Sequence, residues 1–156
     1  MAGSADKTLA DKKIELPKAA APVANYVPVV IAGNLAFVSG QVTVWNGEFK
    51  FTGKLGKEFT VEQGQQAARI CGLNIIAQLK AALGGSLDRV KRCVKLGVFV
   101  NSTESFTDQP KVANGVSDLM VEVFGEAIGK HARSAVGMAG LPGNAPVEVE
   151  MIVEVE

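Results

Sequence analysis

Apolar residues follow two different periods along the chain, and each period predicts a different kind of element. Residues 147–155 alternate apolar side chains with glutamate over most of their length, which is typical of a strand with one buried face. Residues 60–83 instead carry apolar side chains at a spacing of three and four, which predicts an amphipathic helix. The chain therefore combines strands and helices that each bury one side.

The two predicted helices have recognisable ends. Thr60 and Gln63 form a capping-box pattern, in which each side chain bonds the backbone N–H of the other residue. Gly84-Gly85 supplies a left-handed stop after this first helix. A second amphipathic helix is predicted over residues 106–124, with Asp108 as its N-cap. Each helix should pack its apolar side against a sheet.

Short apolar runs bounded by turn signals predict the strands. Gly33-Asn34 and Asn46-Gly47 are tight-turn pairs of the kind that joins the strands of a hairpin. The predicted strands cover residues 28–32, 35–44, 49–52, 90–100, 134–141 and 147–155. The order of elements is therefore β-β-β-α-β-α-β-β, an α+β arrangement.

The number of elements decides how this sheet is covered. Two helices cannot cover both faces of a six-stranded sheet, so we expect both helices on one face. Residues 35–38 and 96–100 are apolar on both sides of their strands, so the other face needs a partner, which predicts an oligomer. We assign residues 17–156 to a single domain and the polar residues 1–16 to an N-terminal extension, in which a short docked helix is possible.

Composition excludes several classes of protein. The 156 residues carry 16 basic and 16 acidic side chains and contain no basic run, which argues against a nucleic-acid partner. No 18-residue apolar run and no signal peptide are visible, so we expect a cytoplasmic protein without a membrane span. Cys71 and Cys93 fit no metal or redox motif and are interpreted as buried small hydrophobes.

Candidate chemistry centres on Arg133, which stands where a loop is expected to enter the strand at 134–141. Its guanidinium can grip a carboxylate through two parallel hydrogen bonds. Ser39-Gly40-Gln41 closes an earlier apolar strand, and the two segments together suggest a small-molecule site that recognises an acid. The residues alone leave a plainer alternative open, in which Arg133 pairs with Glu126 or with another carboxylate at a subunit boundary.

Several of these segments together resemble the RidA (YjgF-type) family, whose members also carry the older label endoribonuclease L-PSP. The similarity extends from about Tyr26 to the C-terminus, and the pattern is that of a divergent subgroup. The segments that carry the resemblance are Tyr26…Ser39-Gly40-Gln41, Ala68-Arg69…Asn74, Val98-Phe99-Val100, and Arg133-Ser134-Ala135-Val136…Leu141-Pro142…Val147-Glu148-Val149-Glu150.

This resemblance implies a fold, an assembly and an activity. The fold would be chorismate-mutase-like, assembled as a homotrimer with sites in the clefts between subunits. The activity would be enamine/imine deamination, in which reactive 2-imino acids are hydrolysed to 2-keto acids and ammonia. No metal and no cofactor would be needed, because an imine is already electrophilic.

The resemblance also implies a role for each matched residue. Arg133 would bind the substrate carboxylate, and the backbone N–H of Ala135 would be a second anchor. Glu148 would orient or activate the attacking water, which requires a carboxylate within hydrogen-bond reach. Tyr26 would line or close the cleft, and Ser39 could hold the water. Without the resemblance, Tyr26 could be an interface aromatic and Glu148 a solvated strand position.

Two positions depart from the family pattern. Glu104 stands where an asparagine is common, and a carboxylate there would repel an anionic substrate if it faced the cleft. Ala135 replaces a frequent cysteine, and residues 45–59 form a longer segment than in compact members. These departures favour an alternative function, a non-catalytic module that binds or senses a 2-keto acid. A ribonuclease is a third hypothesis, which the neutral charge argues against.

Overall fold

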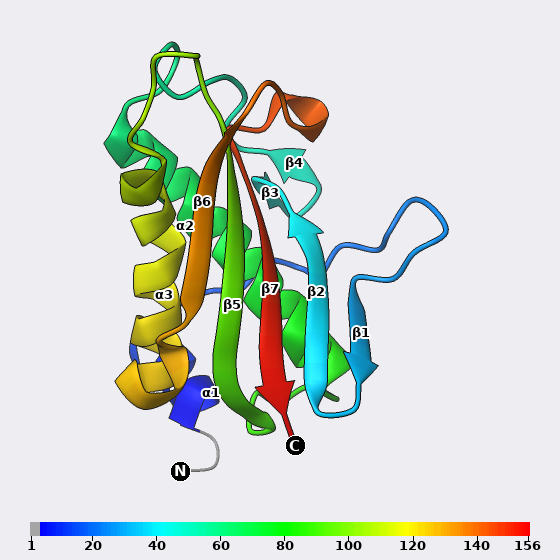
Figure 1. Cartoon of the computed structure of the whole chain (residues 1–156). Coiled ribbons are helices and arrows are strands. Elements are labelled where there is room, and N and C mark those ends of the chain that lie inside the picture. The colour runs from blue at the N-terminus through cyan, green and yellow to red at the C-terminus, as the bar shows by residue number, and fades with distance from the viewer. Residues whose placement is uncertain (1–3) are drawn as a thin grey trace.

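The structure is a computed structural model, and it describes residues 4–156. Its centre is a mixed sheet in which neighbouring strands run antiparallel, except that β5 and β6 are parallel (Figure 1). The strands lie in the order β1 (Val29–Ala32), β2 (Leu35–Gln41), β7 (Val147–Val155), β5 (Val90–Asn101) and β6 (Ala132–Met138). The predicted α+β fold class is therefore confirmed.

The two long helices, α2 (Val61–Ala82) and α3 (Gln109–Gly129), lie on the same face of the sheet, as predicted (Figure 1). The alternation in β7 has the expected effect, because Val147, Met151 and Val155 are buried towards the helices. No helix formed by residues 4–156 covers the opposite face (Figure 1). We call it the open face; it carries Phe37 and Ser39 on β2, Glu148, Glu150 and Ile152 on β7, Lys95, Gly97 and Phe99 on β5, and Val136 on β6.

The predicted six-stranded sheet is wrong in one detail, because the main sheet has five strands. The chain leaves this sheet after Gln41, and β3 (Val44–Trp45) pairs only with β4 (Glu48–Phe49). Tertiary contacts hold this ribbon apart from the sheet: the Asn74 side chain on α2 donates to the Val44 carbonyl at 2.6 Å. The turn prediction is confirmed, since Asn46 and Gly47 have φ values of 49° and 91°.

Local sequence patterns predicted the ends of α2 correctly. The Thr60 hydroxyl accepts from the Gln63 N–H, and the Gln63 side chain accepts from the Thr60 N–H, so the capping box is complete. Asp108 is the N-cap residue of the second helix, as predicted, but its side chain makes no cap bond. This helix continues past residue 124 to Gly129, through a kink at Gly125 where φ is 80°. A short 3-10 helix, η1 (Pro142–Asn144), precedes β7.

The N-terminal extension contains a helix, α1 (Ser4–Asp11), which packs against α3. Asp6 ties this helix to the α2–β5 connection. Its carboxylate accepts from the Leu87 N–H at 2.9 Å and from the Ser86 hydroxyl at 3.0 Å, and it lies 3.0 Å from the Lys80 ammonium. These contacts reach across some 80 positions of the sequence, so the pattern of residues 1–16 alone could not have shown them.

Candidate functional site

Arg133 lies on the edge strand β6, which begins at Ala132 rather than at the predicted residue 134. It pairs with the fully buried Leu96 of β5, so its side chain leaves the sheet on the helix-covered side. There its Nη1 donates to Asn114 Oδ1 at 2.9 Å and to Ser117 Oγ at 3.1 Å. Both acceptors are neutral, so the positive charge of Arg133 is not balanced by these two contacts.

The plainer alternative for Arg133, an ion pair with Glu126, is not formed within the chain. The carboxylate of Glu126 lies 3.4 Å from the ammonium of Lys130, one turn along the same helix. Among residues 4–156, Arg133 forms no ion pair with any carboxylate. The guanidinium is therefore held in place by α3 while its charge remains available to an external anion.

Ser39 and Tyr26 lie near one another at the opposite edge of the sheet. The Ser39 hydroxyl donates to the Val27 carbonyl at 2.9 Å, which fastens the loop carrying Tyr26 to the end of β2. The Tyr26 side chain is 54% exposed, so it is free to line a cleft. A cavity of about 150 Å³ separates this loop from α2; its lining includes Tyr26, Gly40, Gln41, Asn74 and Gln78.

Glu148 lies on β7 directly beside Gly40. A Cβ atom placed on Gly40 would stand 2.2 Å from the Glu148 Oε1, so only glycine leaves room for this carboxylate. Burial raises the pKa of Glu148, and the negative charge of Glu150 on the same face raises it further. A raised pKa makes this carboxylate a stronger proton acceptor than an ordinary glutamate. The space left by the missing Gly40 side chain is therefore occupied by the Glu148 carboxylate of the same chain.

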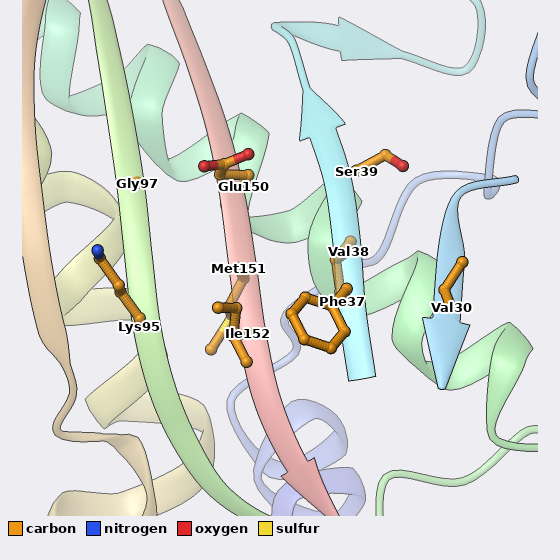
Figure 2. Close-up of a pocket in the computed structure, with 9 residues that line it drawn as sticks. All are labelled: Val30, Phe37, Val38, Ser39, Lys95, Gly97, Glu150, Met151 and Ile152. Atoms are coloured by element: carbon orange, nitrogen blue, oxygen red, sulfur yellow. The ribbon is translucent and has the colours of Figure 1, made fainter. Parts of the chain in front are cut away.

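The open face is hollowed next to these residues. The residues that line the hollow include Val30 on β1, Phe37 and Ser39 on β2, Glu150 and Ile152 on β7, and Lys95 and Gly97 on β5 (Figure 2). Its volume is about 300 Å³. The absent side chain of Gly97 helps to make it, because a Cβ atom there would meet the Glu150 side chain at 3.0 Å. Most of its lining is apolar, and its charged lining residues are Glu150 and Lys95.

One chain does not bring the predicted site residues into a single cluster. Arg133 and Ala135 lie on β6, whereas Ser39, Tyr26 and Glu148 gather around the end of β2. From strand spacing and rise, the Cα atoms of Arg133 and Glu148 are roughly 14 Å apart, on opposite faces of the sheet. Glu104 is exposed in the loop after β5 and belongs to neither group.

The sequence did not single out the residues that hold Arg133. Asn114 and Ser117 stand three positions apart on α3, a spacing that places both on one side of the helix. His131 lies just before β6 with its Nε2 2.9 Å from Ser117 Oγ. The available signal was a pair of polar positions three residues apart, which is weak because α3 also carries charged residues such as Lys111 and Asp118.

The cysteines fit the plain interpretation. Cys71 and Cys93 are both fully buried and free. Burial raises the pKa of Cys93 to about 12 and the pKa of Cys71 well above its usual value, so neither is a thiolate nucleophile. Within residues 4–156 no group of three or more His, Cys, Asp or Glu side chains is arranged to hold a metal ion. The helices in the same range are too short or too polar to cross a bilayer.

Known proteins resemble this chain over nearly its full length. The family model described as "YjgF/chorismate mutase-like, putative endoribonuclease" matches residues 6–155. Protein TCP17 of Trypanosoma cruzi is 56% identical over 141 residues, which cover 90% of this chain and 88% of that protein. The 2-iminobutanoate/2-iminopropanoate deaminase of Dermatophagoides farinae is 32% identical over 143 residues, covering 92% and 95%.

A solved structure shows the same fold. The protein Atu1372 of Agrobacterium tumefaciens, whose function is unknown, is 44% identical and superposes with a TM-score of 0.89, covering 99% of this chain and 93% of that one. The mixed sheet with its helices on one face, the Arg-Ser…Leu-Pro…Glu-x-Glu block and these similarities agree. The chain belongs to the YjgF/chorismate mutase-like family.

Proposed function

We propose that this protein is an enamine/imine deaminase that hydrolyses reactive 2-imino acids to 2-keto acids and ammonia, as a cytoplasmic homotrimer. The observation that carries the proposal is Arg133, a fixed guanidinium whose two partners in the chain are neutral. Such a group is suited to the carboxylate that every 2-imino acid carries. The relative from Dermatophagoides farinae, named 2-iminobutanoate/2-iminopropanoate deaminase, supports the same reaction.

Glu148 supplies the proton transfers in this mechanism. Water adds to the carbon of the protonated imine while the Glu148 carboxylate takes one of its protons, giving a neutral carbinolamine. The same proton then passes from Glu148 to the carbinolamine nitrogen, the C–N bond breaks and ammonia leaves. The remaining protonated carbonyl gives its proton to the Glu148 carboxylate and becomes the keto oxygen, and Glu148 then releases this proton to solvent. A carboxyl group with a raised pKa is suited to both transfers, since it must accept a proton and return it.

Ser39 and Tyr26 would shape the water-binding side of the cleft. The Ser39 hydroxyl already donates its proton to the Val27 carbonyl, so its lone pairs are left to accept from a water molecule. Tyr26 stands beside the same strand end with an exposed ring. Arg133, with the Ala135 N–H as second anchor, would hold the other end of the substrate.

A second copy of the chain would join these two halves. Arg133 and Glu148 lie too far apart within one chain to contact one small imino acid, by the roughly 14 Å estimated above. The open face exposes Phe37, Val136 and other apolar side chains that an oligomer would cover. In a trimer, Arg133 of one subunit could meet the Glu148 group of the next, so that each cleft contains one complete site.

The deaminase can be tested with imino acids produced in place by an amino-acid oxidase. Wild type should accelerate ammonia release, and Arg133→Ala should reduce kcat/KM by at least about a thousandfold, because the substrate loses its charged anchor. Arg89→Ala is the matched control, since it removes the same charge from the far end of β5. Full activity of Arg133→Ala would refute this mechanism.

Failure of the wild type to hydrolyse any imino acid would favour the alternative function. In that case, thermal stabilisation by 2-keto acids without turnover would identify a binding module, as binding to the folded state raises its stability. Glu104 would then be the first position to change to asparagine. RNA cleavage that persisted in Arg133→Ala would be ascribed to a contaminant, because the chain offers no basic surface run for RNA.

A further inference from the structure

The guanidinium of Arg133 has two edges that can each take a carboxylate, and one of them is already in use. Both protons of Nη1 are committed, one to Asn114 Oδ1 at 2.9 Å and one to Ser117 Oγ at 3.1 Å. Among residues 4–156, Nε and Nη2 have no hydrogen-bond partner. These two nitrogens form the side edge of the planar group and can donate two parallel hydrogen bonds to one carboxylate.

His131 fixes the direction of the hydrogen bond at Ser117. Its Nδ1 lies 2.7 Å from the Gly129 carbonyl, which can only accept, so Nδ1 carries the ring proton. The Nε2 of the neutral ring must then accept the Ser117 hydroxyl proton across 2.9 Å. With its proton directed to His131, the Ser117 oxygen presents a lone pair to Arg133. The order of donation is thus Arg133 to Ser117, Ser117 to His131, and His131 to Gly129.

The helix that carries Asn114 and Ser117 cannot easily shift. Gly115, between them in sequence, faces α2 so closely that a Cβ atom there would stand 2.1 Å from the Gln65 carbonyl oxygen. The Gln65 side chain also donates to the Lys111 carbonyl of α3 at 2.8 Å. Close backbone packing therefore fixes α3 against α2, and with it the two acceptors that hold Arg133.

We propose that Asn114, Ser117 and His131 are positioning residues, which hold Arg133 by Nη1 and present its Nε–Nη2 edge to the substrate carboxylate. This inference rests on the proposed function and adds the residues that orient its carboxylate anchor. The positioning group consists only of neutral side chains, so it orders the guanidinium without neutralising it. An acidic residue at position 114 or 117 would order Arg133 equally well but would compete with the substrate.

The positioning group should affect binding more than chemistry. Ser117→Ala removes one of the two acceptors of Arg133 Nη1. The guanidinium can then rotate, and its Nε–Nη2 edge is no longer held in the orientation that binds the carboxylate. We expect KM for the imino acid and Kd for the product-like anion 2-oxobutanoate to rise about tenfold, with kcat within about twofold of wild type. Asn114→Ala should act in the same way.

The experiment compares wild type with Ser117→Ala, Asn114→Ala and the conservative Ser117→Thr, which keeps the hydroxyl. Ser117→Thr should restore KM and Kd to within about twofold of wild type, which a loss of packing alone would not predict. Ser4→Ala, on the distant helix α1, is the matched control for removing a hydroxyl. Calorimetry gives Kd for 2-oxobutanoate, steady-state kinetics gives KM and kcat, and ¹⁵N spectra of the histidine ring report which nitrogen carries the proton.

The outcomes separate this inference from the proposed function. Binding of 2-oxobutanoate without turnover of any imine, with Kd weakened in Ser117→Ala and Asn114→Ala, would refute the deaminase and support the positioning group. Turnover with unchanged KM and Kd in both variants would refute the positioning group and leave the deaminase in place. A ring proton on Nε2, or a wild type that binds no carboxylate, would also overturn the inference.

Discussion

The two faces of the sheet are built from the same strands but have different compositions. On the helix-covered face of β7, Val147, Met151 and Val155 are each at most 2% exposed. On the open face, Phe37 and Val136 remain 41% and 44% exposed, among carboxylates and glycines. The helix-covered face is fully packed in the single chain. The open face also carries large apolar side chains, but these remain exposed. The difference predicts that the single chain can bury its core while its open face waits for a partner to cover it.

The candidate catalytic groups follow the same division. Glu148 lies on the open face beside the gap left by Gly40, where its charge is partly desolvated. Arg133 emerges on the helix-covered side, but at the edge strand, where α3 supplies polar partners. The substitutions below test whether the covered face determines stability and the open face determines activity.

Glu148→Gln should have the largest effect and should act on catalysis alone. The amide cannot take a proton from water, so we expect kcat to fall by about 10²–10⁴-fold, or about 3–5 kcal/mol in the activation barrier. Its thermal midpoint should stay near that of wild type. Glu150→Gln, on the same face, is the matched control and should keep kcat at the pH optimum.

The pH profile should report the same carboxyl group. Burial and the charge of Glu150 raise the pKa of Glu148 above its ordinary value of 4.5, and the base is active only when ionised. Activity should therefore fall as pH drops through this raised pKa. Glu150→Gln removes one of the two causes, so the acidic limb should move to lower pH. An unchanged limb would mean that another group controls it.

Met151→Ala and Phe37→Ala compare the two faces directly. Met151 is 1% exposed under the helices, so its truncation should lower the free energy of unfolding by about 2–5 kcal/mol. Phe37 is already exposed in the single chain, so its truncation should cost the chain far less and should instead weaken association. Denaturant unfolding and analytical ultracentrifugation of both variants would measure the two effects. Equal destabilisation of a monomeric form would contradict the division.

Asp6→Ala should have the smallest effect, confined to the attachment of α1. Burial would raise the pKa of Asp6, but hydrogen bonds from the Leu87 N–H, Lys80 and Ser86 outweigh it and lower the pKa. Losing these contacts should cost about 1–2 kcal/mol at neutral pH. Because the native pKa is lowered, this contribution is complete above the ordinary value of 3.8 and disappears as pH falls below it. Asp11→Ala, at an exposed ion pair, is the control.

Sequence patterns predicted those parts of the fold that depend on near neighbours. The capping box at Thr60 and Gln63, the hairpin turn at Asn46-Gly47 and the alternation in residues 147–155 each arise from residues a few positions apart. The strand predicted at residues 49–52 does not join the main sheet. Its first part pairs instead with Val44–Trp45, and the Val44 carbonyl accepts from Asn74 of α2, thirty positions away. The short helix α1 depends in the same way on the distant partners of Asp6.

The sequence predicts a set of candidate site residues but not their arrangement. Family resemblance proposes Arg133 and Glu148 as site residues, whereas the faces on which they lie depend on strand register and on where β6 begins. Asn114 and Ser117 could not be assigned to Arg133, because only the packing of α3 against β6 brings them together. The separation of Arg133 from Glu148 is likewise a property of the strand order, which no local pattern contains.

We propose that Arg133 of one subunit completes the Glu148 site of another. This arrangement can be tested by co-expressing Arg133→Ala and Glu148→Gln with different tags and purifying the mixed trimers through both tags. Each mixed trimer then contains one intact site of three, so activity should recover to about a third of wild type although each variant alone is inactive. Mixed trimers that remain as inactive as the separate variants would place both residues in one subunit's site and contradict the account.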